Sequence, residues 1–292
     1  MSKIAVLTDS NSGITIEEGK RNGIHVIPMP FVINGEEYLE EISLSQKEFY
    51  EKLKQNANIS TSQPSIYSLM DTWDTLLKEY DEIIFIPMSS GLSATCANAT
   101  SLSRQEEYKG KVHVVDNQRI SITQKLSCYE AKHLVDLGKS SDEIVSYLMN
   151  TKMTSSIYIM VDTLEYLKKG GRVTPAAAAL GALLNIKPVL QIRGQKLDSY
   201  CKVLSTRVGR IKMINAIKHD LENDFKVAYE QGKMVLSIAH TDNLKEAQSF
   251  KDQVQETFPN LKILYLDSLS LSVSCHIGPG SLAISCAISN LD

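Results

Sequence analysis

The feature that most constrains the fold is an apolar run at residues 83–88 that passes directly into a hydroxyl-rich turn, residues 89–95 with the sequence SSGLSAT. A pattern of small residues with helical spacing follows the turn. A buried strand, a glycine-containing turn and a helix in this order place free backbone N–H groups and serine hydroxyls at a helix N-terminus. Such a turn can hold an anion, and an ordinary Ser/Thr helix cap would explain it as well.

The same alternation of apolar runs and amphipathic helices fills the first half of the chain. Strand patterns lie at residues 4–7, 24–33, 83–88 and 112–115. Between them, residues 66–77 repeat apolar side chains at helical spacing. This order predicts an α/β domain with a mostly parallel sheet covered by helices on both faces. Within it, Asn34-Gly35 is a hairpin turn signal.

The second half of the chain has a different pattern. A hairpin is predicted at residues 188–198 around Arg193-Gly194, and helices are predicted at residues 176–184 and 206–225. A strand at residues 234–240, another helix and a final strand pair complete the order. Runs of hairpin and helix are typical of an α+β domain. We therefore predict two domains, residues 1–152 and residues 153–292.

Composition excludes several classes of protein. The 31 Lys and Arg against 34 Asp and Glu give a net charge of −3. The chain therefore lacks the excess of basic residues typical of a nucleic-acid-binding protein. No apolar run reaches the length of a membrane span, and no signal peptide is visible, so we expect a cytoplasmic protein without stable membrane insertion. The five cysteines are scattered and the His, Asp and Glu residues show no ligand spacing, so we expect no metal.

Hydroxyl-rich loops follow three of the predicted strands, at residues 8–12, 89–95 and 116–118. Ligands of open parallel sheets bind beyond the carboxyl ends of the strands, where these loops should meet. Residues 61–65, TSQPS, form a fourth hydroxyl cluster at the start of the helix predicted at residues 66–77. Each cluster alone is explained by helix capping, and together they indicate an anion site on one rim.

Two further side chains could join such a site. Gly170-Gly171 permits a turn that directs Arg172 away from the preceding helix, although a solvated arginine is an equally good interpretation. His276 lies in the sequence CHIGPG, which predicts irregular backbone after a strand, a place that often presents one polar side chain. A lone histidine is more often structural than functional.

Catalytic motifs give one alternative. The chain has neither G-x-x-x-x-G-K-[ST] nor G-x-G-x-x-G. Residues 91–95 approach the nucleophile elbow but lack its second glycine. Because Ser93, Asp162 or Asp116, and His276 stand in the order found in hydrolases, a serine hydrolase of lipid esters using Ser93 and His276 is the rival hypothesis. A binding module for another amphiphile or a small phosphorylated ligand is a second one.

Taken together, six segments resemble the DegV family. They are TDS at residues 8–10, TSQPS at 61–65, SSGLS at 89–93, LEYLKKGGRV at 164–173, LLNIKP at 183–188 and HIGPG at 276–280. They occur in order and span nearly the whole chain. The GGR segment with the following LNIKP is the most specific of them.

The resemblance implies a fold and a function. Members of the family are bacterial fatty-acid-binding proteins, several of which are carrier subunits of fatty acid kinase. The expected fold is an α/β/α domain with a small hairpin excursion near residues 28–43, followed by an α+β domain, with the ligand between them. The chain would bind a long-chain fatty acid in a buried tunnel, present its carboxylate to a kinase subunit and carry the acyl-phosphate, with no catalytic residue and no cofactor of its own.

By the same resemblance, five residues would bind the carboxylate: Thr61, Ser62, Ser93, Arg172 and His276. The family usually has glycine where this chain has Ala94, and commonly an aromatic residue where it has Cys96. Alanine would restrict the backbone after Ser93, and cysteine would leave more room, so the preferred acyl chain cannot be transferred from the family.

A basic concentration in the second half gives a candidate docking surface for the kinase. It comprises Lys196, Lys202, Arg207, Arg210 and Lys212. Any one of these side chains is explained as part of a solvated helix face. As a cluster in a chain of net charge −3, they predict a surface that attracts an acidic partner.

Overall fold

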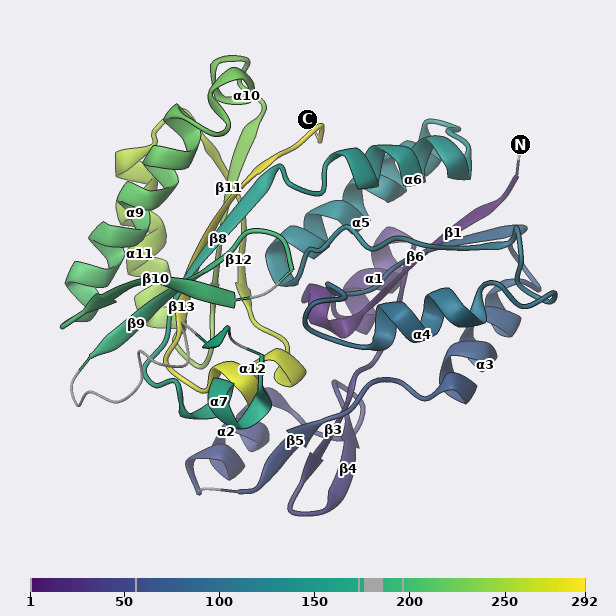
Figure 1. The fold of residues 1–292 in the computed structure, drawn as a ribbon, viewed down its shortest axis with the longest axis horizontal. Coiled ribbons are helices and arrows are strands. Elements are labelled where there is room, and N and C mark those ends of the chain that lie inside the picture. Colours follow the sequence, from purple (N-terminus) through teal and green to yellow (C-terminus); the bar gives the residue numbers. More distant parts are fainter. Residues whose placement is uncertain (1, 56, 173, 176–185, 196, 292) are drawn as a thin grey trace. The chain divides into compact units, whose positions relative to one another are not determined.

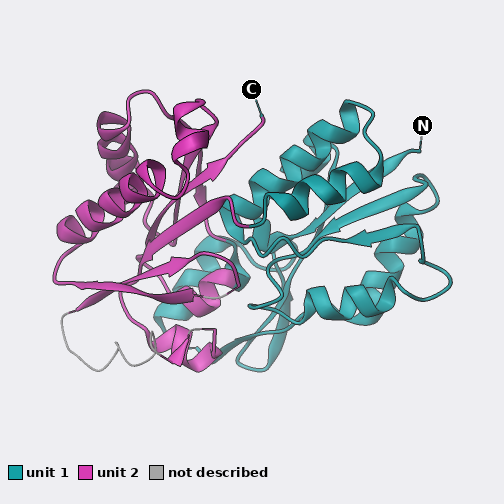
Figure 2. Ribbon diagram, turned by 45° about the horizontal axis from the view of Figure 1, so that its top comes forward, with its two compact units in different colours: residues 1–152, 270–272, 291–292 teal, residues 153–269, 273–290 magenta. Residues whose placement is uncertain are grey.

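The computed structural model describes residues 2–55, 57–172, 174–175, 186–195 and 197–291, and divides into two compact units (Figure 1, Figure 2). Unit 1 comprises residues 1–152, 270–272 and 291–292, and unit 2 comprises residues 153–269 and 273–290. The helix predicted at residues 176–184 lies outside the described residues. No described helix is both long enough and apolar enough to cross a bilayer.

Unit 1 contains the expected parallel sheet. Its strands, in the order β2-β1-β6-β7, are β2 (Ile24–Ile27), β1 (Ile4–Asp9), β6 (Glu82–Ile86) and β7 (Val112–Val114). Every neighbouring pair is parallel, and all six residues of β1 are buried, as expected for a central strand covered on both faces. The extended run predicted at residues 24–33 is divided, because Pro28 lacks the N–H that a ladder requires.

Helices cover both faces of this sheet. Alternate strand residues point to opposite faces, so Leu7 and Phe85 enter one core and Val6 and Ile84 enter the other. The first core includes side chains of α3 (Ile66–Leu76) and α4 (Thr95–Leu102). The second includes side chains of α5 (Ser121–Asp136) and α6 (Ser141–Asn150), and α1 (Ile16–Asn22) packs on β2.

A second, three-stranded sheet belongs to unit 1. Its order is β4-β3-β5, with β4 (Glu36–Leu39), β3 (Pro30–Ile33) and β5 (Ile59–Thr61), and α2 (Gln46–Lys54) lies between β4 and β5 in the sequence. Strands β3 and β4 form an antiparallel hairpin. At its tip Asn34 and Gly35 have φ values of 52° and 88°, the left-handed conformation required by the turn that Asn-Gly predicts.

Unit 2 is built on a mixed six-stranded sheet in the order β10-β9-β8-β13-β11-β12. The strands are β8 (Ser155–Met160), β9 (Lys187–Ile192), β10 (Leu197–Val203), β11 (Met234–His240), β12 (Lys262–Ser268) and β13 (Leu282–Ile288). Only β11 and β12 are parallel neighbours. The final two strands, predicted as a pair, lie on either side of β11 instead.

The helices of unit 2 include two long ones that bury apolar side chains against this sheet. These are α9 (Thr206–Glu222) and α11 (Leu244–Thr257), whose Met213, Ile217 and Phe250 pack with Leu236 of β11. Three shorter helices are α7 (Glu165–Gly170), α10 (Lys226–Glu230) and α12 (Leu271–Ile277). Their arrangement can be followed in Figure 1.

One expectation about local structure is wrong. His276 was expected in irregular backbone after a strand, but it lies in the last turn of α12. The helix ends one residue later, at Ile277, and the following Gly278 has φ 76° and donates its N–H to the carbonyl of Ser274. The glycine therefore acts as a helix terminator rather than as part of an extended loop.

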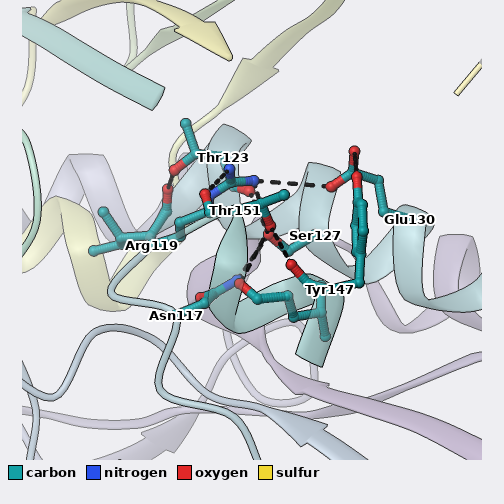
Figure 3. Close-up of polar contacts among 9 residues, drawn as sticks. Asn117, Arg119, Thr123, Ser127, Glu130, Tyr147 and Thr151 are labelled. Carbon is teal, nitrogen blue, oxygen red and sulfur yellow. Dashed lines mark hydrogen bonds and ion pairs between the residues drawn. The ribbon is translucent and has the colours of Figure 1, made fainter. Parts of the chain in front are cut away.

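A buried polar network fixes the C-terminal end of α6 in unit 1 (Figure 3). The Arg119 guanidinium is almost completely buried and donates to the Ser127 hydroxyl at 3.0 Å and to the Thr151 carbonyl at 2.7 Å. Its Nη1 lies 4.0 Å from a carboxylate oxygen of Glu130, and the other oxygen accepts from Tyr147 at 2.7 Å. The arginine thus joins α5, α6 and the loop after β7.

Replacing Arg119 should destabilise unit 1, because it leaves the Glu130 carboxylate buried without its cation. We expect Arg119→Met to lower the free energy of unfolding by about 3 kcal/mol. The double variant Arg119→Met with Glu130→Met should recover at least half of that loss. Urea unfolding followed by the fluorescence of Trp73, the chain's single tryptophan and a buried residue of unit 1, measures both. Equal losses in both variants would contradict the coupling.

Candidate functional site

The carboxyl edge of the parallel sheet in unit 1 is held together by Asp9, the last residue of β1. Its buried carboxylate accepts from the backbone N–H of Asn11 at 3.1 Å and of Met88 at 2.9 Å, and from the side chains of Asn11 and Gln124 at 2.9 and 3.2 Å. Burial raises the pKa of Asp9, and these donors oppose that effect. The loop after β1, the loop after β6 and helix α5 therefore meet at one side chain.

The serine loop after β6 is fixed on its other side by the loop after β7. The Ser90 hydroxyl donates to Asp116 at 2.6 Å, and its backbone N–H donates to the same carboxylate at 3.2 Å. The Ser89 N–H donates to the Arg119 carbonyl at 2.9 Å. Three of the four hydroxyl-rich loops are thereby joined by hydrogen bonds, as their positions after neighbouring parallel strands predicted. The acidic residues Asp9 and Asp116 hold these loops in place.

Ser93 lies two residues before α4, which begins at Thr95. Its hydroxyl accepts from the Thr95 N–H at 3.2 Å and lies 2.9 Å from the Thr95 hydroxyl. The residue between them, Ala94, has φ −76° and ψ −5°, a conformation that alanine adopts without strain. Alanine in place of the glycine expected from the resemblance therefore leaves the backbone of this turn unstrained. Cys96 is buried, and burial with the nearby Asp116 raises the pKa of its thiol to about 11.

Thr61 and Ser62 stand on a different sheet of unit 1. Thr61 ends β5 and pairs with Phe31 of β3, and the N–H of Ser62 donates to the Pro30 carbonyl at 3.2 Å. The capping interpretation holds for the last residue of the cluster, since the Ser65 hydroxyl accepts from the N–H of Ser68 and caps α3. The hydroxyls of Thr61 and Ser62 are thus left outside the cap of α3.

Arg172 and His276 belong to unit 2, and they meet at Gly170. The His276 ring lies so close to Gly170 that a Cβ atom added there would be 2.0 Å from Nδ1. Arg172 donates through Nη1 to the carbonyl of the same glycine. Burial, together with the Arg172 charge, lowers the pKa of His276 to about 4. At neutral pH the imidazole is uncharged and the positive charge of this pair is on the arginine.

The LEYLKKGGR and HIGPG segments, which carry Arg172 and His276, make a second close contact. Gly278, with φ 76°, lies against the ring of Tyr166, where an added Cβ atom would be 2.4 Å from Cδ2. A side chain at position 278 would meet both backbone strain and the ring. The two contacts explain why positions 170 and 278 of these segments are glycines.

The carboxylates of the rival triad hypothesis are bound elsewhere. Asp116 accepts from Ser90, and Asp162 pairs with Lys187. A triad needs an acid that accepts the histidine N–H, and both candidate acids are bound to other side chains. The described part of the chain therefore gives no support to a Ser-His-acid triad. Among its residues no group of three or more His, Cys, Asp or Glu is placed to hold a metal ion.

The candidate docking residues of unit 2 differ from one another. Lys202 and Arg207 are exposed. Arg210 is instead bound to α11, since it donates to the Glu246 carbonyl at 2.6 Å, lies 2.7 Å from the Glu246 carboxylate and stacks on Phe250. Its guanidinium therefore stabilises the packing of α9 on α11. It is not available to bind a partner protein, which is the role that the sequence predicted. Lys196 lies outside the described residues.

Sequence reasoning missed three residues that connect these elements: Asn11, Glu40 and Ser272. Ser272 donates to Asn11 at 2.5 Å, and its hydroxyl lies 3.4 Å from the Glu40 carboxylate. Asn11 was within a singled-out segment, but its partner is 261 residues away. No local pattern could have indicated such a pair.

Comparison with known proteins agrees with this architecture. The chain is 32% identical to Protein DegV of Bacillus subtilis over 283 residues, covering 96% of this chain and 98% of that protein. It is 30% identical to a DegV domain-containing protein of Clostridium perfringens over 291 residues, covering 97% of each.

Solved structures show the same fold. The crystal structure of DegV from Bacillus subtilis, described as a fatty acid binding protein, has a TM-score of 0.84 and 30% identity, covering 99% of this chain and 100% of that one. A DegV family protein from Thermus thermophilus has a TM-score of 0.86 at 24% identity, covering 98% and 99%. The profile of the DegV family matches residues 3–289, and the chain therefore belongs to the DegV family.

Proposed function

We propose that this protein binds a long-chain fatty acid in a buried tunnel and acts as a carrier, without catalysing a reaction of its own. The observation that carries the proposal is the full-length similarity, at 30% identity and a TM-score of 0.84, to a DegV protein described as fatty acid binding. The chemistry of the candidate residues supports it, because hydroxyls, an arginine and a neutral histidine are all donors to a carboxylate.

The proposed carboxylate ligands are Thr61, Ser62, Ser93, Arg172 and His276. A buried carboxylate must be hydrogen-bonded, since an unpaired charge in an apolar site is prohibitive. Affinity comes mainly from the tail, because each buried methylene contributes about 0.8 kcal/mol and twelve contribute about 10 kcal/mol before the cost of association. The head group therefore fixes the orientation of the ligand more than it fixes the affinity.

We further propose that the bound carboxylate is presented to a separate kinase subunit. One carboxylate oxygen would attack the γ-phosphorus of ATP held by that subunit, the bond from phosphorus to ADP would break, and the acyl-phosphate would remain on this carrier. Lys202 and Arg207 form the proposed docking surface, together with the exposed apolar side chains of Leu204 and Val208. Basic and apolar groups side by side suit a partner surface with acidic residues.

The first prediction is that the purified protein contains its ligand. Lipid extraction followed by mass spectrometry of protein prepared without added lipid should give free fatty acid in stoichiometric amount. The tail would be enclosed, so it should survive purification. Absence of fatty acid, together with turnover of a lipid ester and labelling of Ser93 by a fluorophosphonate, would overturn the proposal in favour of a hydrolase.

The contact between Gly170 and His276 gives the second prediction. In Gly170→Ala the new methyl group would meet the imidazole at 2.0 Å, so His276 must move. We expect fatty acid affinity to fall about tenfold, the loss typical of a hydrogen bond to a charged group. Titration with cis-parinaric acid, a fluorescent fatty acid, measures it.

Gly171→Ala is the matched control for that variant. Gly171 has φ 65° and no atom within 4 Å of an added Cβ, so the change strains the backbone by about 1 kcal/mol without touching His276. Equal affinities of the two variants would show that the His276 position is irrelevant to binding.

The docking surface gives a third prediction. Arg207→Glu should weaken the coupling to the kinase, measured as the rate of acyl-phosphate formation at limiting carrier, and should leave the fatty acid content unchanged. Lys218→Glu, at an exposed position nearer the other end of α9, is the matched control. Unchanged coupling in Arg207→Glu, or an equal loss in both variants, would contradict the proposed surface.

A further inference from the structure

The Glu40 carboxylate lies at the start of α12, although it comes from the segment directly after β4. It accepts from the backbone N–H of Leu271, the first residue of α12, and from the Ser10 hydroxyl at 2.6 Å. The Glu40 backbone N–H donates to the Met29 carbonyl at 3.2 Å, and this bond fixes the backbone that carries the carboxylate. Glu40 thus supplies an N-terminal acceptor that a helix usually takes from its own cap residue.

A second bond holds the same turn of helix. The Ser272 hydroxyl donates to the Asn11 side chain at 2.5 Å, and the Asn11 amide donates to Asp9 at 2.9 Å. Asp9 in turn accepts from the N–H of Met88, directly before the serine loop. Leu271 and Ser272 belong to unit 1 with all these partners. A continuous line of hydrogen bonds therefore runs from the loop of Ser93 to the first turn of α12.

Helix α12 depends on such outside bonds because it is short. It has seven residues, and the first four N–H groups of any helix have no partner within it. Helices of this length do not form stably on their own. The last turn of the same helix carries His276.

The surroundings make an ionised carboxylate at this position costly. Glu40 is 4% exposed. The charged groups near it are acidic: Glu41 is the next residue, and Asp9 is hydrogen-bonded to Asn11. A third, Glu48 of α2, lines a cavity that Glu40 also lines. That cavity has a volume of about 360 Å³ and is also lined by Leu271. Burial, assisted by the Glu41 charge, raises the pKa of Glu40 to about 7 in spite of its hydrogen bonds.

The raised pKa of Glu40 makes the stability of the fold depend on pH. Since the pKa of Glu40 in the folded state is about 7 against an ordinary value of 4.5, the folded protein binds the proton more tightly than the unfolded chain does. This residue therefore makes folding less favourable as pH rises from about 4.5 to about 7. Glu40 lowers global stability at neutral pH while making the bonds that hold α12.

We propose that Glu40 is a positioning residue, which holds the first turn of α12 so that His276 in the last turn stays against Gly170 and Arg172. The inference rests on the proposed fatty acid function for its ligand-binding consequence. Its structural consequence, the environment of the His276 ring, is independent of any ligand.

The ligand-free test is the titration of His276 by NMR, with its ring signal assigned through His276→Gln. In the wild type the pKa of His276 should be about 4. In Glu40→Ala the start of α12 loses its acceptor, so the ring should become more solvated and its pKa should rise to about 5 or above. In Glu40→Gln the amide oxygen still accepts from Leu271, so the pKa should stay near the wild-type value. A wild-type pKa of His276 in folded Glu40→Ala would overturn the proposal.

The ligand test uses cis-parinaric acid between pH 6 and pH 8. Wild-type affinity should weaken as pH falls through about 7, because protonated Glu40 is a weaker acceptor for the helix N–H. Glu40→Gln should give a flat profile, and Glu40→Ala should bind about tenfold more weakly at every pH in this range. Glu48→Gln, which keeps a capping-box side chain on the same cavity, should keep the wild-type profile.

The outcomes separate this inference from the proposed function. No binding of cis-parinaric acid to the wild type, with the expected His276 titrations, would refute fatty acid binding and leave the positioning role intact. Tight binding by the wild type, with Glu40→Gln keeping the wild-type pH profile, would refute the role of Glu40 alone. Circular dichroism at the titration temperature confirms that each variant is folded.

Discussion

The buried carboxylate of Asp9 is the interaction on which the carboxyl edge of the parallel sheet depends. A charge removed from water needs several donors, and Asp9 takes them from its own loop, from the loop after β6 and from α5. Each of these donors also opposes the rise in pKa that burial causes. The serine loop consequently cannot move away from β1 without leaving this carboxylate short of hydrogen bonds. Its geometry is fixed before any ligand arrives.

Unit 2 uses a different physical constraint, close packing onto glycine. The His276 ring occupies the space of a Gly170 side chain, and the Tyr166 ring occupies that of Gly278. Such contacts have no tolerance for an added methyl group. They hold an imidazole and a guanidinium at one glycine, and burial together with the Arg172 charge keeps the pKa of His276 near 4.

The sequence was sufficient for features that depend on local physics. Alternating apolar runs predicted the parallel strands, and Asn34-Gly35 predicted the hairpin turn. The carboxyl-edge rule also brought three of the hydroxyl loops together correctly, because it follows from strand direction alone.

What the sequence could not indicate depends on partners far along the chain. His276 was placed in a loop because glycine and proline follow it, yet the seven-residue α12 forms there with acceptors from Glu40 and Asn11. Arg210 was grouped with exposed cations, although Glu246 on α11 binds it. In each case the decisive hydrogen bond or ion pair joins elements that no periodicity connects.

The charge state of the candidate head-group residues has a consequence for a carrier. A neutral imidazole and neutral hydroxyls donate hydrogen bonds without adding positive charge, so Arg172 supplies the charge on the histidine side of the proposed site. In the proposed carrier function the carboxylate becomes an acyl-phosphate with a different charge and shape, and a rigid double salt bridge would favour one of the two forms strongly. Neutral donors discriminate less between them, because a serine or threonine hydroxyl can turn toward a carboxylate oxygen or a phosphate oxygen at similar cost. A site that must accept one ligand and release another is better served by such donors than by a second fixed cation.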